Sequence, residues 1–162
     1  MSGYIKCGNC LDLMKQIKTQ SIDLTVTSPP YDNLRDYKGY SFDFEHIADQ
    51  LYRITKNGGV VVWIVSDATI EGSETGTSFK QALYFKEIGF NIHDTMIWLK
   101  DTFQFPCSTR YGNCFEYMFI FSKGTPLSVN KILDRKINGA RQKFMEHQGI
   151  RTERHFEKAI II

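Results

Sequence analysis

The fold is decided by residues 22–31, Ile-Asp-Leu-Thr-Val-Thr-Ser-Pro-Pro-Tyr. Apolar and β-branched side chains dominate the first six positions, and this composition is typical of a β-strand. The two prolines stop that strand, because proline fixes φ and offers no backbone N–H to a sheet. The residue before each proline is also restricted to extended conformations. The sequence therefore predicts a strand that runs into a stiff loop made of Ser28 to Tyr31.

Predicted strands and helices alternate on both sides of this loop. In chain order they are a strand at residues 4–7, a short helix at 11–17, the strand at 22–27, a helix at 44–54 closed by residues 57–59, a strand at 60–65, a helix at 79–88 closed by Gly89, and strands at 96–99 and 117–121. The unbroken apolar run at 60–65 indicates a strand buried on both faces of a parallel sheet. The last two strands suit an antiparallel hairpin. This order predicts an α/β sheet with right-handed crossovers.

Length and composition suit one compact domain with its own core, since the chain has 162 residues and 42% of them are hydrophobic. No apolar run approaches the ~20 residues that cross a bilayer. The first residues also lack the apolar segment of a signal peptide, so we expect a cytoplasmic protein. The four cysteines, at positions 7, 10, 107 and 114, are expected to be free thiols. A zinc or redox pair at Cys7-x-x-Cys10 is the alternative.

Charge is distributed unevenly along the chain. Residues 123–162 hold nine Lys and Arg against four Asp and Glu, whereas the rest of the chain has a small acidic excess. A near-neutral body with a basic end suits a polyanionic partner such as DNA. A solvated surface tail explains the same composition equally well, and the sequence leaves both interpretations open.

The loop that follows the strand has the groups to handle an exocyclic amine. Ser28 offers its hydroxyl and Pro29 its carbonyl, and the prolines hold these two acceptors at a fixed separation. The amine lone pair of adenine or cytosine is delocalised into the ring, and two hydrogen bonds from the NH₂ group favour a pyramidal, nucleophilic nitrogen. The base would have to leave the duplex to reach the loop, and Tyr31 could stack on it. The alternative is that Pro-Pro-Tyr merely ends a strand.

A set of ordered blocks resembles a known family. These blocks are residues 5–14, similar to a Gly-Asp opening block, residues 21–31 with Thr-Ser-Pro-Pro-Tyr, residues 56–65 with Lys-Asn-Gly-Gly and a strand, and residues 116–123 with a final strand. Together they resemble the N6-adenine/N4-cytosine DNA methyltransferases of restriction-modification and phage systems. The order is similar to the β-type arrangement, in which the catalytic half precedes the half that binds the methyl donor.

The resemblance implies a fold, a cofactor and a set of site residues. The fold is an α/β, Rossmann-like methyltransferase sheet, mostly parallel with a C-terminal antiparallel hairpin, and incomplete. The cofactor is S-adenosyl-L-methionine and the partner is DNA. The catalytic residues are Ser28, Pro29, Pro30 and Tyr31. The donor-binding residues are Asn9, which stands where the family usually has Asp, with Cys10, Thr27 and Ser28.

Further candidates come from their positions in the sequence. Asp67 follows the strand at 60–65 and either lines the same site or caps the next helix. Arg35, Tyr37 and Lys38 interleave charge with an aromatic ring after the loop, which suits contact with DNA, and so does Arg110. A solvated loop is the alternative. The four histidines show no metal-ligand spacing, so we expect no metal site.

One element of the family is absent from the 162 residues, namely the Phe-x-Gly-x-Gly loop that cradles the donor. The resemblance therefore implies a catalytic part over residues 1–123. Residues 124–162 would then be the start of a target-recognition region or a disordered tail. Two central strands would be lacking and one sheet edge would be unpaired, favouring a second chain or self-association. Three interpretations remain. The first is a DNA methyltransferase whose other half lies on another chain or was lost, and the second is an inactive or DNA-binding remnant. The third is a methyltransferase for RNA or for protein glutamine, and Ser28 argues against the protein-glutamine enzyme. The target base stays open.

Overall fold

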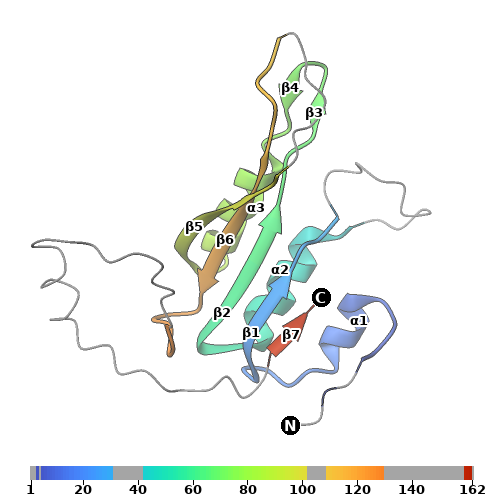
Figure 1. Cartoon of the computed structure of the whole chain (residues 1–162). Coiled ribbons are helices and arrows are strands. Elements are labelled where there is room, and N and C mark those ends of the chain that lie inside the picture. Colours follow the sequence, from blue (N-terminus) through green and yellow to red (C-terminus); the bar gives the residue numbers. More distant parts are fainter. Residues whose placement is uncertain (1–2, 4, 31–41, 102–108, 130–158, 162) are drawn as a thin grey trace, which may run out of the picture.

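The computed structural model describes residues 3, 5–30, 42–101, 109–129 and 159–161. Its main sheet has the strand order β5-β6-β2-β1-β7. These strands are β1 (Ile22–Thr27), β2 (Thr55–Val65), β5 (Asn91–Leu99), β6 (Phe115–Ser122) and β7 (Ala159–Ile161). β1 pairs in parallel with β2 and with β7, whereas β6 pairs antiparallel with both β2 and β5. The predicted α/β class and C-terminal antiparallel hairpin are thus confirmed (Figure 1).

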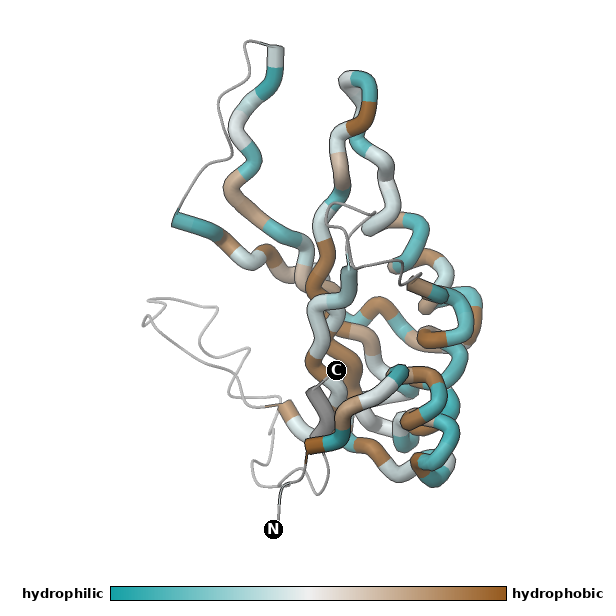
Figure 2. Tube along the Cα trace, turned by 90° about the vertical axis from the view of Figure 1, so that its right-hand side faces the viewer, coloured by the Kyte–Doolittle hydropathy of each residue, from teal (hydrophilic) through white to brown (hydrophobic). Residues whose placement is uncertain are grey.

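Three helices and a small hairpin complete the described fold. They are α1 (Cys10–Lys15), α2 (Phe44–Ile54), α3 (Thr77–Glu87) and the two-stranded ribbon of β3 (Thr69–Ile70) with β4 (Ser73–Glu74). The helices α2 and α3 lie on the same face of the sheet (Figure 2). None of the helices in the described ranges is long and apolar enough to cross a membrane.

The core forms between the sheet and this pair of helices, and it is built from aromatic rings. Phe85 of α3 is fully buried and stacks on Phe121 of β6 with ring centroids 4.3 Å apart. Its other face and edges meet Trp63 at 5.0 Å and Phe44 at 5.6 Å. Such ring pairs stabilise a core beyond their buried area. They fix α3 and α2 against β2, the strand that neighbours the loop at Ser28.

Burial along β2 alternates, which corrects the prediction of a strand buried on both faces. Val61, Trp63 and Val65 are buried, whereas Val60, Val62 and Ile64 are only half-buried. The buried set faces α2 and α3, and no helix of the described residues covers the opposite face. An apolar run shows that a strand is largely buried but does not show which layer covers each face.

Two predictions near the sheet are wrong, namely the strand at residues 4–7 and the gap at residues 57–59 between the helix at 44–54 and the strand at 60–65. Residues 5–7 form no strand, and Ile5 is fully exposed. The helix α2 ends at Ile54, because Thr55 turns to an extended conformation and opens β2. The glycines at 58 and 59 lie inside that strand. Gly58 has φ of +81°, and its N–H donates to the Lys123 carbonyl. A glycine that allows a left-handed backbone was mistaken for a helix end.

The side of β1 away from β2 is paired by a strand that was not predicted. Ala159–Ile161 pairs in parallel with Leu24, Thr25 and Val26. Residues 159–161 thus continue the sheet on the side of β1 away from β2. This short pairing makes β1 a central strand with a parallel neighbour on each side. The expected unpaired sheet edge was not assigned to a particular strand.

The start of α2 carries a charge pair whose response to pH has a definite sign. The Asp43 side chain caps the helix by accepting from the His46 N–H and also contacts the His46 ring nitrogen at 2.8 Å. The hydrogen bond that the His46 ring donates to Asp43 raises the pKa of His46, and the same bond lowers the pKa of Asp43. The pair therefore stabilises α2 above the ordinary pKa of an aspartate. That contribution is lost as the pH rises through the raised pKa of His46.

Replacing Asp43 by asparagine is expected to return the pKa of His46 toward its ordinary value. Asparagine keeps an oxygen that can cap the helix but removes the negative charge. An NMR titration of the His46 ring in both proteins checks this. An unchanged pKa in Asp43→Asn would contradict the pairing.

Candidate active site

The Ser-Pro-Pro loop lies where the sequence places it, directly after the carboxyl end of β1. Thr27 is the last residue of the strand and is buried, and Ser28 is exposed. Pro29 is buried and Pro30 is half-buried. The carboxyl ends of parallel strands are where open α/β sheets bind their ligands. Tyr31 lies outside the described residues.

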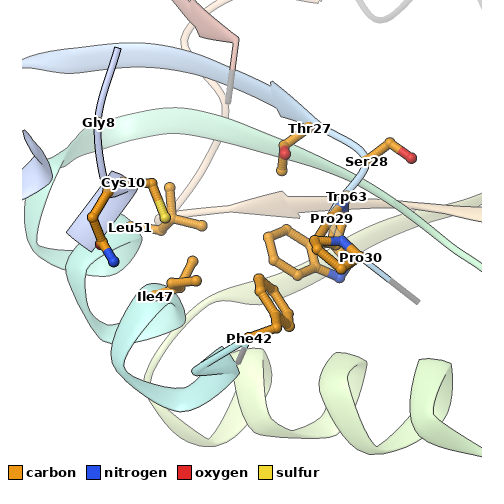
Figure 3. A pocket seen from close by; sticks show the side chains of 11 residues that line it. Gly8, Cys10, Thr27, Ser28, Pro29, Pro30, Phe42, Ile47, Leu51 and Trp63 are labelled. Atoms are coloured by element: carbon orange, nitrogen blue, oxygen red, sulfur yellow. The ribbon is translucent and has the colours of Figure 1, made fainter. Parts of the chain in front are cut away.

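A cavity of about 230 Å³ opens beside this loop. It is lined by Gly8, Asn9, Cys10, Thr27, Ser28, Pro29, Pro30, Phe42, Ile47, Leu51 and Trp63. In Figure 3 the aliphatic side chains of Ile47 and Leu51 lie on one side, and the Trp63 and Phe42 rings lie with the prolines on the other. The Ser28 hydroxyl points away from these rings. None of these lining residues carries a charged side chain. The described cavity is therefore an apolar slot with neutral hydrogen-bonding groups at its rim.

Asn9 reaches this cavity because it opens α1. Its side-chain oxygen accepts from the Leu11 N–H at 2.9 Å, and its backbone has the extended conformation of an N-cap residue. The predicted neighbours of the loop, Asn9 and Cys10, therefore do line the same cavity as Thr27 and Ser28. One lone pair of the Asn9 oxygen is used by the cap, and an amide oxygen has two. Cys7, Cys10 and Cys114 form no disulfide within the described ranges.

The aromatic floor of the cavity was missed by the sequence reasoning. Trp63 pairs with Thr27 across the two parallel strands, so its ring lies beside the loop. Its ring nitrogen donates to the Gln81 side-chain oxygen at 2.8 Å, which fixes the ring plane. The centroids of the Phe42 and Trp63 rings are 6.4 Å apart. The available signal was the prediction that residues 60–65 form a buried strand of a parallel sheet, which placed Trp63 in a strand but not beside residues 22–27.

Other predicted residues lie elsewhere or outside the described ranges. The structure does not bring Asp67 into the cavity. Both of its oxygens accept from Ser78, at 2.8 Å from the N–H and 2.5 Å from the hydroxyl, so it caps the start of α3. Burial raises the pKa of Tyr117, and the charge of Asp67 adds to that effect.

Arg110, which was predicted to contact DNA, is not among the described residues that line the cavity. The Arg110 guanidinium donates to the Gly72 carbonyl and lies 3.9 Å from the Glu74 carboxylate, which ties it to the β3–β4 hairpin. Arg35, Tyr37 and Lys38 lie outside the described residues. Their proposed contacts stay predictions.

Curated relatives of this chain carry the name methyltransferase. M.BamHII of Bacillus amyloliquefaciens, an orphan methyltransferase, is 67% identical over 116 residues, which are 72% of this chain and 44% of that protein. M.BslI of Bacillus sp. (strain NEB-606), a type II beta methyltransferase, is 27% identical over 76% of this chain and 16% of its own length. The chain thus spans less than half the length of these relatives.

Solved structures share the fold. The PvuII DNA methyltransferase (cytosine-N4-specific) superposes with a TM-score of 0.61 over 89% of this chain and 62% of its own, at 19% identity. A putative DNA modification methylase of Thermus thermophilus, complexed with S-adenosyl-L-methionine, gives 0.58 over 90% and 65%, at 20% identity. A sequence model described as DNA methylase matches residues 22–158, which begin at β1 and include the Ser-Pro-Pro loop. This chain belongs to that family, the N6-adenine/N4-cytosine DNA methylases.

Proposed function

We propose that this chain is the catalytic half of a DNA methyltransferase that transfers a methyl group from S-adenosyl-L-methionine to cytosine N4 or adenine N6. The observation that carries the proposal is the position of the Ser-Pro-Pro loop, Ser28-Pro29-Pro30, which we call the catalytic arc. It lies at the carboxyl end of β1, beside a cavity that Asn9 also lines. M.BamHII carries the name methyltransferase, and the PvuII enzyme is described as cytosine-N4-specific. We extend the methyltransferase activity of these proteins to this chain. The target base, cytosine or adenine, is left open.

The chemistry assigned to the arc is hydrogen bonding to the target amine. The Ser28 hydroxyl and the Pro29 carbonyl accept from its two hydrogens, and the lone pair on nitrogen becomes available for attack. Because Pro29 is buried and both prolines have fixed φ, these acceptors do not reorganise during the reaction. The exposed position of Ser28 suits a base that arrives from outside the protein. Tyr31 would stack on that base.

The donor supplies a methyl group activated by a sulfonium centre. In this chain its neighbours would be Asn9, Cys10, Thr27 and Ser28, with the Asn9 oxygen as an acceptor for the adenine amine. The cavity of about 230 Å³ is smaller than the roughly 300–1,000 Å³ of ordinary ligand pockets. It suits one planar ring better than the whole donor. We therefore assign it to part of the donor only, and Asp67 keeps its proposed donor role without support from this geometry.

A second candidate function has an observation of its own. Because the 162 residues contain no Phe-x-Gly-x-Gly loop, the chain on its own suits a DNA-binding or inactive relative that keeps the catalytic arc. A boundary after residue 123, between the catalytic part and the basic segment, is compatible with both candidate functions. Residues 130–158 lie outside the described ranges, so the role of the basic segment stays a prediction.

We expect the 162-residue chain alone to bind S-adenosyl-L-methionine weakly and to transfer no methyl group to DNA. The physical reason is that a one-sided site leaves most of the donor surface in water. Isothermal titration calorimetry measures the binding, and radiolabelled methyl incorporation into mixed DNA measures the transfer. Micromolar binding together with incorporation would overturn this expectation.

A chimera tests whether the chain transfers a methyl group when the rest of a methyltransferase is supplied. It joins this chain to the part of M.BamHII that lies beyond the matched region. Methyl transfer by the chimera, lost when the arc is changed, supports the proposed function. A folded chimera that binds the donor and never methylates DNA favours the inactive or DNA-binding candidate.

A further inference from the structure

Exposed apolar side chains gather at one edge of the sheet. Of the eleven large hydrophobic residues exposed among the described residues, six belong to β5 and to α3, the helix packed beneath it. They are Met96, Ile97, Trp98 and Leu99 of the strand with Phe79 and Leu83 of the helix, and we call them the edge patch. Single exposed hydrophobics are ordinary, but a contiguous group marks a contact surface.

The strand β5 is the last strand on its side of the sheet, next to β6 alone. One side of its backbone therefore has no strand partner among the described residues, which is the arrangement that invites pairing with another chain. A bulge lies between Ile92 and Asp94, and from Asp94 to Leu99 the pairing with β6 is regular. The central residues of this regular stretch, Thr95 to Leu99, carry no charge to discourage such pairing.

The two flanks of α3 differ in what they face. Gln81 accepts a hydrogen bond from Trp63 of β2, and Tyr84 contacts Asp49 of α2, so this flank points into the molecule. On the opposite flank the Phe79 ring meets the Tyr117 ring at 5.2 Å. Tyr117 is the register partner of Ile97. The exposed side chains of α3 therefore continue the helix side of β5, where Ile97 and Leu99 lie. Met96 and Trp98 alternate with them and lie on the opposite face.

Charges beside the edge patch are self-complementary about Ile97. If two copies of β5 pair antiparallel with Ile97 opposite its own copy, Met96 lies opposite Trp98 and Thr95 opposite Leu99. The next pair is Asp94 opposite Lys100, of opposite charge, and the two-fold axis creates it twice. The Asp94 side chain is 63% exposed and that of Lys100 is 40% exposed, so both can reach a second copy.

From this geometry we propose that the chain forms a closed dimer in which two β5 strands pair antiparallel about Ile97. The main sheet then runs continuously through both copies, and the β5 backbone groups that face outward find partners. On the helix side Ile97 meets its own copy, flanked by Phe79. On the opposite face Asp94 meets Lys100 of the other copy. Lys100 also pairs with Glu116 within its own chain, which places it at the strand end where this second contact forms.

The first test is Ile97→Lys, measured by sedimentation velocity with the full chain from nanomolar to high micromolar concentration. The native chain is expected to reach a dimer and no larger species. The variant places two ammonium groups opposite each other, so its dissociation constant is expected to rise at least about tenfold. Ile70→Lys is the matched control, because Ile70 is 58% exposed on β3, away from the patch, against 49% for Ile97. It is expected to dimerise like the native chain.

The second test exchanges the charges. Asp94→Lys and Lys100→Glu are each expected to weaken their own dimers, because each brings like charges together twice. An equal mixture of the two variants is expected to form a heterodimer, because both contacts are then of opposite charge. Circular dichroism confirms that each variant is folded. A monomer at every concentration, open polymers that grow with concentration, native dimerisation of Ile97→Lys, or a mixture that stays monomeric would each overturn the proposal.

Discussion

Replacing Phe85 by alanine is expected to lower the free energy of unfolding by about 3–5 kcal/mol. Phe85 is fully buried, and its ring lies within 6 Å of four other aromatic rings, those of Phe44, Trp63, Phe90 and Phe121. Removing it takes away the buried ring and leaves a cavity that α3 and the sheet can close only in part. Because Trp63 forms the floor of the site, the same change is also expected to loosen the loop at Pro29.

The measurement is urea unfolding followed by circular dichroism. Phe79→Ala is the matched control, on the same helix with the same substitution, because the Phe79 side chain is 49% exposed. Its ring contact with Tyr117 predicts a loss of only about 1 kcal/mol. Both changes are made in the Ile97→Lys background, so that association does not contribute. Equal losses for the two variants would show that the aromatic core is not centred on Phe85.

Replacing Ser28 by alanine is expected to lower the turnover of the active chimera by about 10²-fold, with little change in its affinity for DNA. The hydroxyl accepts from the amine as the nitrogen becomes a nucleophile, so its loss is felt in the transition state rather than in binding. The readout is the single-turnover rate of methyl transfer at saturating donor and DNA. This prediction depends on the proposed function, because the arc acts only when a donor is held beside it.

Ser73→Ala is the matched control for this experiment. Ser73 is an exposed serine on the β3–β4 hairpin, and its hydroxyl contacts only the neighbouring Glu74 carbonyl in the described structure. It is expected to keep the full rate. If Ser28→Ala also keeps the full rate in a chimera that methylates DNA, the amine is activated by another group and the role given to Ser28 is wrong.

Local patterns in the sequence were enough to predict the centre of the fold. The strand that stops at Pro29, the helix at 44–54, the strand at 60–65 and the late hairpin all occur in the structure. The reason is that proline, β-branched runs and helical spacing act on the backbone of their own segment. The resemblance to the family also predicted that Asn9 lies beside the loop. In the structure Asn9 lines the same cavity as Ser28.

The buried face of α3 shows where such patterns stop being sufficient. Helical spacing grouped Phe79, Ala82, Leu83 and Ile88, and of these the structure buries only Ala82. The buried face of α3 also contains the polar residues Ser78 and Gln81. Ser78 is satisfied by Asp67 and Gln81 by the Trp63 ring nitrogen. A buried polar side chain is tolerated only when it has a partner. Those partners are 11 and 18 residues away in the chain, so no local window contains the information.

The sequence by itself therefore determined the strand, the stiff loop and the acceptor groups of this protein. Only the tertiary structure decided what surrounds them. It placed Trp63 and Phe42 in the cavity, closed the outer edge of β1 with Ala159–Ile161, and left β5 as an edge strand. The physical reason is that backbone conformation follows from a residue and its neighbours. Register, layer and edge depend instead on which distant surfaces exclude water together.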